Sequence, residues 1–124
     1  MSCLEQLDEI MEEQKRTLRS GVLRETQARR ERLKRLYCCI KHGEQELLDA
    51  LKQDLGKSPS EGYSTELGMV YHEIREAVEK LSSWNRPRRG KAGIASFPSK
   101  GYRVPEPVGE VLIMSPWNYP VQLS

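Results

Sequence analysis

A short, unbroken apolar run, Val111-Leu112-Ile113-Met114, lies near the end of this chain. Such a run is typical of a strand that is buried on both faces, as in a parallel α/β sheet, because a half-exposed strand alternates apolar and polar residues. A buried strand needs neighbouring strands at its edges and packed layers on its faces. Only ten residues follow Met114. The sequence therefore predicts a truncated α/β fold, which begins a sheet and does not finish it.

The preceding residues have helical periodicity instead. Apolar side chains recur every three or four residues in four stretches, which are 4–18, 33–40, 47–55 and 63–84. We therefore expect a mainly α fold of about four helices with short C-terminal β-strands. The expected organisation is a helical region over residues 1–86, a loop over 87–101 and the first strands of an incomplete domain over 102–124.

Individual residues predict where the helices begin and end. Ser20-Gly21 interrupts the first helical stretch, and Thr26 is a candidate N-cap for the second. Gly43 and Gly56 are C-terminal stops for the second and third helices. Each boundary rests on a residue whose backbone or side chain suits a helix end.

The fourth helix has the clearest start. Ser58-Pro59-Ser60-Glu61 places serine at the N-cap, proline at the first helical position and glutamate at the third, which is a capping box. Arg86-Pro87 ends the helix, because the residue before a proline is disfavoured in helical conformation. Gly62 and Gly68 each cost about 1 kcal/mol in such a helix. They indicate either a close backbone approach or a locally weak helix.

The residues after Pro87 predict loop and strand. Residues 87–101 are rich in Arg, Lys, Gly and Pro, which favours a surface loop. Tyr102-Arg103-Val104 alternates as a short strand does. The prolines in Pro105-Glu106-Pro107 limit this strand to the edge of a sheet, because proline has no N–H to donate to a neighbouring strand.

The charge balance argues against nucleic-acid and membrane partners. The chain has 20 Lys and Arg against 18 Asp and Glu, a formal net charge of +2. Basic residues cluster at 29–35 and 86–91, but no aromatic side chain lies within either cluster for base stacking. We interpret both clusters as solvated surface. No apolar run approaches the ~20 residues that span a bilayer, and the N-terminus has no secretory-signal pattern.

The cysteines predict reduced thiols rather than disulfides or a metal site. There are three, an odd number, and Cys38 and Cys39 are adjacent. This pattern is typical of a cytoplasmic protein. Cys38, Cys39 and His42 are three potential zinc ligands, and Cys38 and His42 are spaced to share a helix face. A structural zinc site needs a fourth ligand, and no further Cys or His lies near them in the sequence. We therefore expect no metal, semi-buried Cys38 and Cys39, a surface position for His42 and a structural role for His72.

The segment from Pro105 to Pro120 resembles the one with which aldehyde dehydrogenases enter their cofactor-binding domain. Its most specific part is Pro116-Trp117-Asn118-Tyr119-Pro120, directly after the apolar run. Upstream, residues 51–57, Glu66-Leu67-Gly68 and Glu73-Ile74 are similar to the helical N-terminus of the class 3 branch. The resemblance covers residues 17–124 and implies an N-terminal fragment of an NAD(P)-dependent aldehyde dehydrogenase.

The resemblance also implies a chemistry. In this family a cysteine thiolate attacks the aldehyde, a hydride passes to the nicotinamide, and a glutamate-activated water hydrolyses the thioester. An asparagine amide holds the oxyanion, and the matching residue here is Asn118. The amide suits this role because it donates without a charge and does not titrate. The resemblance also implies that Tyr119 faces the substrate tunnel. It places four residues along the nicotinamide-ribose side of the cofactor, namely Met114, Ser115, Pro116 and Trp117.

The same resemblance places the nucleophile, the base and the pyrophosphate-binding turn beyond Ser124. None of Cys3, Cys38 and Cys39 matches the context of the nucleophile. We therefore expect the parent enzyme to oxidise aldehydes with NAD or NADP, and this chain alone to bind neither cofactor, to be inactive and to self-associate. The residues alone, without the resemblance, favour Asn118 as a turn residue between two proline-bearing segments.

A different class of protein also fits part of the pattern. A free-standing helical interaction module with a mobile C-terminal tail would explain the helical stretches. The apolar run at 111–114 separates the two hypotheses, since an enzyme buries such a strand and a module has no need for it.

Overall fold

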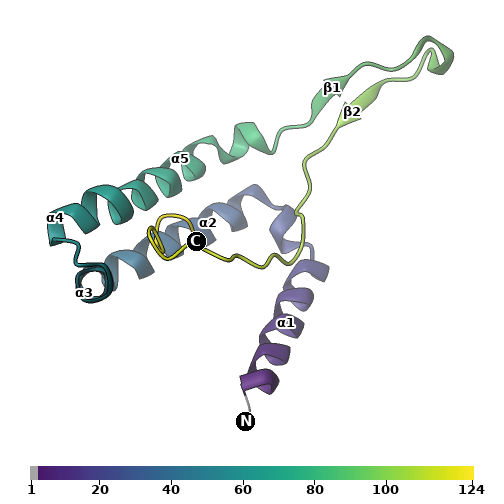
Figure 1. The fold of residues 1–124 in the computed structure, drawn as a ribbon. Helices are drawn as coiled ribbons and strands as arrows, with labels where there is room; N and C mark the ends of the chain where they lie inside the picture. The colour runs from purple at the N-terminus through teal and green to yellow at the C-terminus, as the bar shows by residue number, and fades with distance from the viewer. Residues whose placement is uncertain (1–2) are drawn as a thin grey trace. The chain divides into compact units, whose positions relative to one another are not determined.

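The computed structural model describes residues 3–124 and is mainly helical, as the periodicity predicts (Figure 1). Its elements in chain order are α1 (Cys3–Arg19), a 3-10 turn (Val22–Arg24), α2 (Thr26–His42), α3 (Glu44–Leu55), α4 (Pro59–Gly62), a π-helical segment (Tyr63–Leu67), α5 (Gly68–Trp84), β1 (Arg88–Gly90), a 3-10 turn (Ile94–Ser96) and β2 (Gly101–Arg103). The chain forms two compact units. The first comprises residues up to 29 with 80–110, and the second comprises 30–79 with 111–124.

Most helix boundaries lie where the sequence predicts them. Gly56 follows α3 in the left-handed conformation, with φ of 68°, and its N–H donates to the Lys52 carbonyl. The Ser58 hydroxyl accepts from the Glu61 N–H at 3.2 Å and Pro59 opens α4, which confirms the predicted cap. Thr26 was expected as an N-cap but is the first helical residue of α2. Its Oγ1 instead accepts from Asn85 Nδ2 at 3.1 Å.

The core of the second unit lies between α2, α3, the π-helical segment and the start of α5. Leu48, Leu67 and Tyr71 are buried there, and Tyr37, Ile40, Leu47 and Val121 pack against them. The Tyr71 ring lies 5.0 Å from that of Tyr37, centroid to centroid, in a tilted arrangement. Two members of the predicted apolar stripe, Leu67 in the π-helical segment and Ile74 in α5, are buried as expected. The first member of the stripe, Tyr63, is instead exposed.

A π-helical segment interrupts the long helix at Tyr63–Leu67. At its end the Gly68 N–H donates to the Tyr63 carbonyl, five residues back. A Cβ on Gly68 would lie 2.9 Å from that same carbonyl oxygen, so only glycine fits without a shift. Gly62 instead faces α3, where a Cβ would lie 3.1 Å from Leu48 Cδ2. The two glycines thus reflect close approach, one of the two readings their sequence positions allow.

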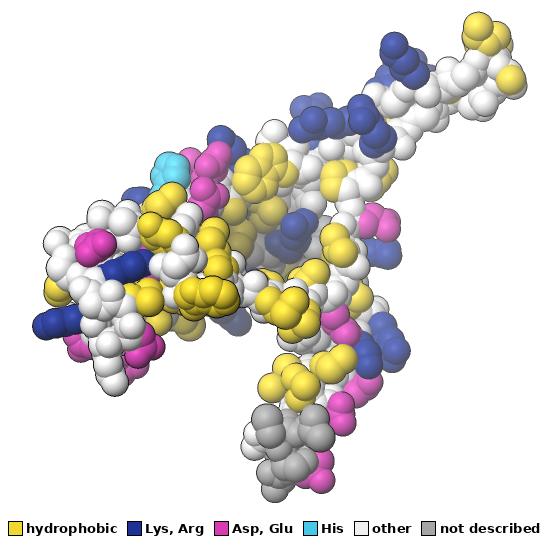
Figure 2. Space-filling view, viewed as in Figure 1, with side chains coloured by type: hydrophobic (Ala, Val, Ile, Leu, Met, Phe, Trp, Pro, Cys, Tyr) yellow, Lys and Arg dark blue, Asp and Glu magenta, His cyan; other side chains and the backbone are white. Residues whose placement is uncertain are grey.

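The first unit carries a two-stranded antiparallel hairpin. β1 pairs with β2 in the register Arg88 to Arg103 and Gly90 to Gly101. The predicted strand at 102–104 is confirmed with a shift of one residue, whereas β1 lies inside the stretch expected to be a loop. The hairpin end exposes hydrophobic side chains, with Ile94 98% and Phe97 87% exposed (Figure 2).

The expected buried strand at 111–114 is wrong for this chain. These residues lie outside any strand, and Val111, Leu112, Ile113 and Met114 are 72%, 84%, 62% and 85% exposed. The sheet described within residues 3–124 consists of β1 and β2 alone, so no strand is available to pair with this segment. With no strand beside it among residues 3–124, the apolar run is left uncovered.

Candidate functional site

The Asn118 turn, residues 118–123, carries Asn118 and Tyr119, two of the residues that the sequence singles out. A single helical turn closes it, since the Leu123 N–H donates to the Tyr119 carbonyl at 3.2 Å. Asn118 and Tyr119 are exposed at its start, and Val121 is partly buried against the core of the second unit. The turn therefore has one apolar anchor and an open face that holds the asparagine.

Lys57 is the first polar anchor of this turn. It follows Gly56, whose left-handed backbone ends α3 and redirects the chain. The Lys57 ammonium donates to Glu66 Oε1 at 2.6 Å and to the main-chain carbonyl of Asn118 at 2.9 Å. It also lies 4.2 Å from the centroid of the Tyr119 ring, a cation–π distance. One ammonium group therefore contacts two consecutive residues of the turn.

Glu66 is the second anchor, and it is completely buried within the π-helical segment. Its Oε2 accepts from the Val121 N–H at 2.8 Å and from the Gln122 N–H at 3.2 Å. Because its Oε1 is bonded to Lys57, each carboxylate oxygen has a donor. A buried carboxylate is costly unless it is paired and hydrogen-bonded, and here it is both.

The other predicted site residues precede the turn on an extended and open segment. Met114, Ser115 and Trp117 are exposed, and Pro116 is partly buried. The structure brings Asn118 and Tyr119 together on Lys57, while these four residues lie outside the two-stranded sheet. An exposed carboxamide on an anchored turn can donate a hydrogen bond to a negatively charged oxygen, and it does so without titrating.

The described cysteines lie apart from this turn in the sequence and offer no prepared nucleophile. Cys38 and Cys39 on α2 are both exposed, so the expectation of semi-buried thiols is wrong. Their neighbouring positions in a surface helix make both accessible to solvent. His72 is exposed on α5, 3.9 Å from Glu76. Across residues 3–124 there is no group of three side chains suited to hold a metal ion.

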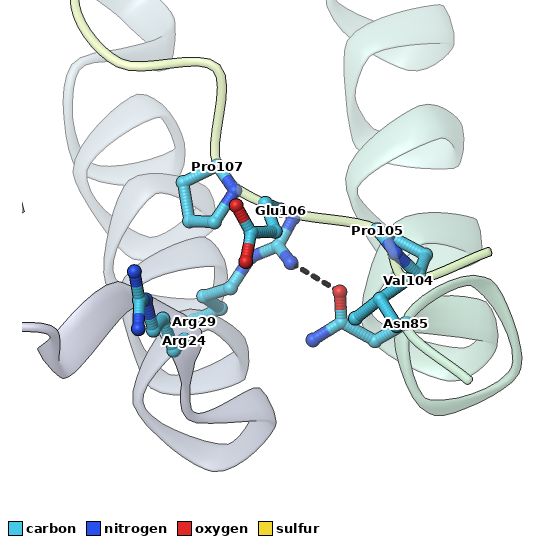
Figure 3. A pocket seen from close by; sticks show the side chains of 7 residues that line it. All are labelled: Arg24, Arg29, Asn85, Val104, Pro105, Glu106 and Pro107. Carbon is cyan, nitrogen blue, oxygen red and sulfur yellow. Dashed lines mark hydrogen bonds between the residues drawn. The ribbon is translucent and has the colours of Figure 1, made fainter. Parts of the chain in front are cut away.

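A separate pocket lies in the first unit, where residues 104–107 pass α2 and the end of α5. It encloses about 170 Å³ and is lined by Arg24, Arg29, Asn85, Val104, Pro105, Glu106 and Pro107 (Figure 3). Within it, Arg29 Nη1 donates to Asn85 Oδ1 at 2.7 Å. Because Asn85 also donates to Thr26, it links the start of α2 to the end of α5. We interpret these contacts as structural.

Comparisons with known proteins show the family and the fold of the chain. A model of the aldehyde dehydrogenase family matches residues 2–124. The chain belongs to the aldehyde dehydrogenase family. It is 35% identical over 120 residues to aldehyde dehydrogenase family 3 member F1 of Arabidopsis thaliana, covering 97% of this chain and 25% of that protein. It is 42% identical over 95 residues to a 4,4'-diaponeurosporen-aldehyde dehydrogenase of Staphylococcus aureus, covering 77% and 21%.

The fold is that of the same family. A solved structure of Staphylococcus aureus AldH in a substrate-bound state superposes with a TM-score of 0.86 and 36% identity, over 99% of this chain and 26% of that one. This aldehyde dehydrogenase chain spans about a quarter of the length of the relatives it matches. No helix among residues 3–124 is long and apolar enough to cross a membrane.

Sequence reasoning missed Lys57 and Glu66 as parts of the site. A signal for Glu66 was present, because it lies three residues after Tyr63 and four before Val70, on the expected apolar stripe. A charged residue on an apolar face needs a partner. The partners are Lys57, nine residues upstream, and two main-chain N–H groups 55 and 56 residues downstream, which helical periodicity does not connect.

Proposed function

We propose that this chain is the N-terminal part of an NAD(P)-dependent aldehyde dehydrogenase that oxidises aldehydes to carboxylic acids. The observation that carries the proposal is the exposed Asn118 amide on a turn whose main chain is held by Lys57 and Glu66. Family membership over residues 2–124 includes the C-terminal tail, which the interaction-module alternative leaves without a role. We therefore do not adopt that alternative.

In this proposal Asn118 is the oxyanion donor. As the aldehyde carbon is attacked by a cysteine thiolate supplied by the rest of the enzyme, negative charge develops on the carbonyl oxygen. The Asn118 carboxamide donates to that oxygen, and its fixed main chain reduces the reorganisation that accompanies this step. Tyr119, beside it, would line the path of the substrate.

The residues before the turn fit a role at the cofactor. Met114 to Trp117 are extended and lie outside the two-stranded sheet, so their main-chain groups are open to a ligand. They would hold the nicotinamide-ribose side of NAD or NADP. When bound, that group supplies the hydride acceptor for the oxidation. A cytoplasmic location is part of the same proposal, and the free Cys38 and Cys39 thiols suit a reducing compartment.

A turnover assay tests this function. The full-length enzyme, meaning this chain joined to the rest of the proposed dehydrogenase, should form reduced nicotinamide when an aldehyde is added. The 124-residue chain prepared alone should give no more than buffer, because neither Cys38 nor Cys39 has the role of the nucleophile. As a matched control, Cys38→Ser and Cys39→Ser in the full-length enzyme should leave turnover unchanged. Turnover by the 124-residue chain alone would contradict the proposal if it disappeared when Cys38→Ser or Cys39→Ser was introduced into that chain.

A further inference from the structure

We propose that Lys57 and Glu66 are positioning residues, which set the rate of aldehyde oxidation by holding the Asn118 turn in place. This proposal rests on the proposed role of Asn118 as oxyanion donor. Neither side chain needs to touch substrate, since both act through the main chain of the turn.

Glu66 fixes the orientation of the turn. Two consecutive main-chain N–H groups, those of Val121 and Gln122, converge on its Oε2 at 2.8 and 3.2 Å. Two donors on one oxygen restrict both the distance and the rotation of the peptide units that carry them. Glu66 is completely buried, so its carboxylate has no water in reach to replace these donors while the turn stays in place.

Lys57 fixes the residue that carries the reacting amide. Its ammonium donates to the carbonyl of Asn118 itself, and this holds the peptide plane that follows the Asn118 side chain. The Lys57 side chain is only 11% exposed, and its other contacts are Glu66 and the Tyr119 ring. Displacing the turn would therefore break the hydrogen bond to Asn118 and the contact with the Tyr119 ring together.

The backbone around the pair suits this role. Glu66 lies in the π-helical segment, and such segments occur often at functional sites. Lys57 follows the left-handed Gly56 that ends α3. Both side chains are thus placed by local backbone features between α3 and α5, while the groups they hold belong to residues 118–122. A misplacement of about 1 Å at a catalytic group can cost on the order of 100-fold in rate.

The test uses Glu66→Gln and Lys57→Met in the full-length enzyme. Glutamine keeps the shape but presents an NH₂ group to one of the donors, and methionine keeps the length without the ammonium. We expect kcat to fall on the order of 10-fold or more, with KM for aldehyde nearly unchanged. Lys57→Arg keeps a charged donor and should restore part of the rate. The matched control is Lys15→Met, which removes the lysine of an exposed ion pair on α1.

A double-variant comparison separates positioning from general weakening. If Glu66 acts through Asn118, Glu66→Gln should lower kcat in the wild-type background and have little further effect in the Asn118→Ala background. A merely structural role would lower kcat equally in both backgrounds, and this result would overturn the proposal. Unchanged kcat in Glu66→Gln and Lys57→Met would overturn it as well. If Asn118→Ala itself keeps the wild-type kcat, it is the proposed function that fails.

Hydrogen exchange gives a readout that does not depend on turnover. In the 124-residue chain, the amides of Val121 and Gln122 should exchange slowly because Glu66 accepts both. Glu66→Gln should speed their exchange, while Lys15→Met should not. Fast exchange at both amides in the wild-type chain would show that the turn is not held, and would overturn the positioning role whatever Asn118 does.

Discussion

Glu44, at the start of α3, takes part in two interactions through one oxygen. Its Oε2 accepts from the Lys41 ammonium at 2.7 Å and from the Tyr71 hydroxyl at 2.7 Å. The bond from Lys41, followed by that from Tyr71, holds the pKa of Glu44 below its ordinary value. Burial, and then the bond to Glu44, raises the pKa of Tyr71 well above its ordinary range. The ionised carboxylate therefore tethers a core tyrosine.

The first prediction concerns pH. A carboxylate whose pKa is lowered by folding stabilises the native state above its unfolded pKa, and the contribution is lost as pH falls through the folded value. Glu44→Gln should therefore be less stable than wild type at about pH 7, and the difference should be smaller at about pH 3, below the ordinary pKa of a glutamate. Urea unfolding at both pH values measures this.

The control for this prediction is Glu46→Gln, which removes a carboxylate from the same first turn of α3. It should lower stability less at neutral pH, because the Lys41 and Tyr71 contacts of Glu44 remain. A stability difference between wild type and Glu44→Gln that stays constant from neutral to acidic pH would show that the ionised carboxylate is not what matters.

Among the elements, regular helices follow from the sequence and the π-helical segment does not. Local residues specify the ends of α3 and α4, as with the Ser58 cap and the left-handed Gly56. The π-helical segment depends on one added residue per turn, which barely changes the apolar period. β1 was missed because its three residues, Arg88 to Gly90, pair through the backbone and show no apolar alternation.

The second prediction tests the π-helical segment. In a regular helix, Gly→Ala stabilises by about 1 kcal/mol. At Gly68 the new Cβ would meet the Tyr63 carbonyl oxygen at 2.9 Å, and main chain cannot move aside as a side chain can. Gly68→Ala should therefore destabilise the protein by about 1–3 kcal/mol. Thermal or chemical unfolding measures the change.

Gly43→Ala is the matched control, because its Cβ would lie an ordinary 3.7 Å from the Cys39 carbonyl and its φ of −89° suits alanine. This variant should fall within about 0.5 kcal/mol of wild type. A Gly68→Ala protein as stable as wild type would mean that the segment relaxes to a regular α-helix at no cost.

For the whole chain, the exposed run at 111–114 is the main departure from a self-sufficient fold. Extended apolar residues without strand partners present an edge to which another copy can pair. The third prediction is that the 124-residue chain self-associates as its concentration rises, and that Ile113→Lys weakens this association. Sedimentation velocity over a concentration series measures it. A chain that stays monomeric throughout, or a variant that associates as wild type does, would contradict this reading.

The candidate site was predictable from the sequence only in part. Asn118 and Tyr119 lie in a compact run of prolines and aromatic residues that resembles the family, so local sequence identifies them. Lys57 and Glu66 join them through contacts 55 to 61 residues apart. Such contacts depend on where the π-helical segment places the buried Glu66 carboxylate. Periodicity indicates which face is apolar, but not which distant main-chain groups a charge on that face will bind.

The role of Asn118 as oxyanion donor is tested most directly by kcat of full-length Asn118→Ala, measured together with its melting curve. Loss of one oxyanion donor costs on the order of 100- to 1,000-fold in kcat. The Asn118 main-chain carbonyl, which accepts from Lys57, remains in this variant, so the melting temperature should change little. We predict a large fall in kcat with a nearly unchanged melting temperature. Wild-type kcat combined with a loss of about 1 kcal/mol of stability, as expected for a turn residue, would contradict it.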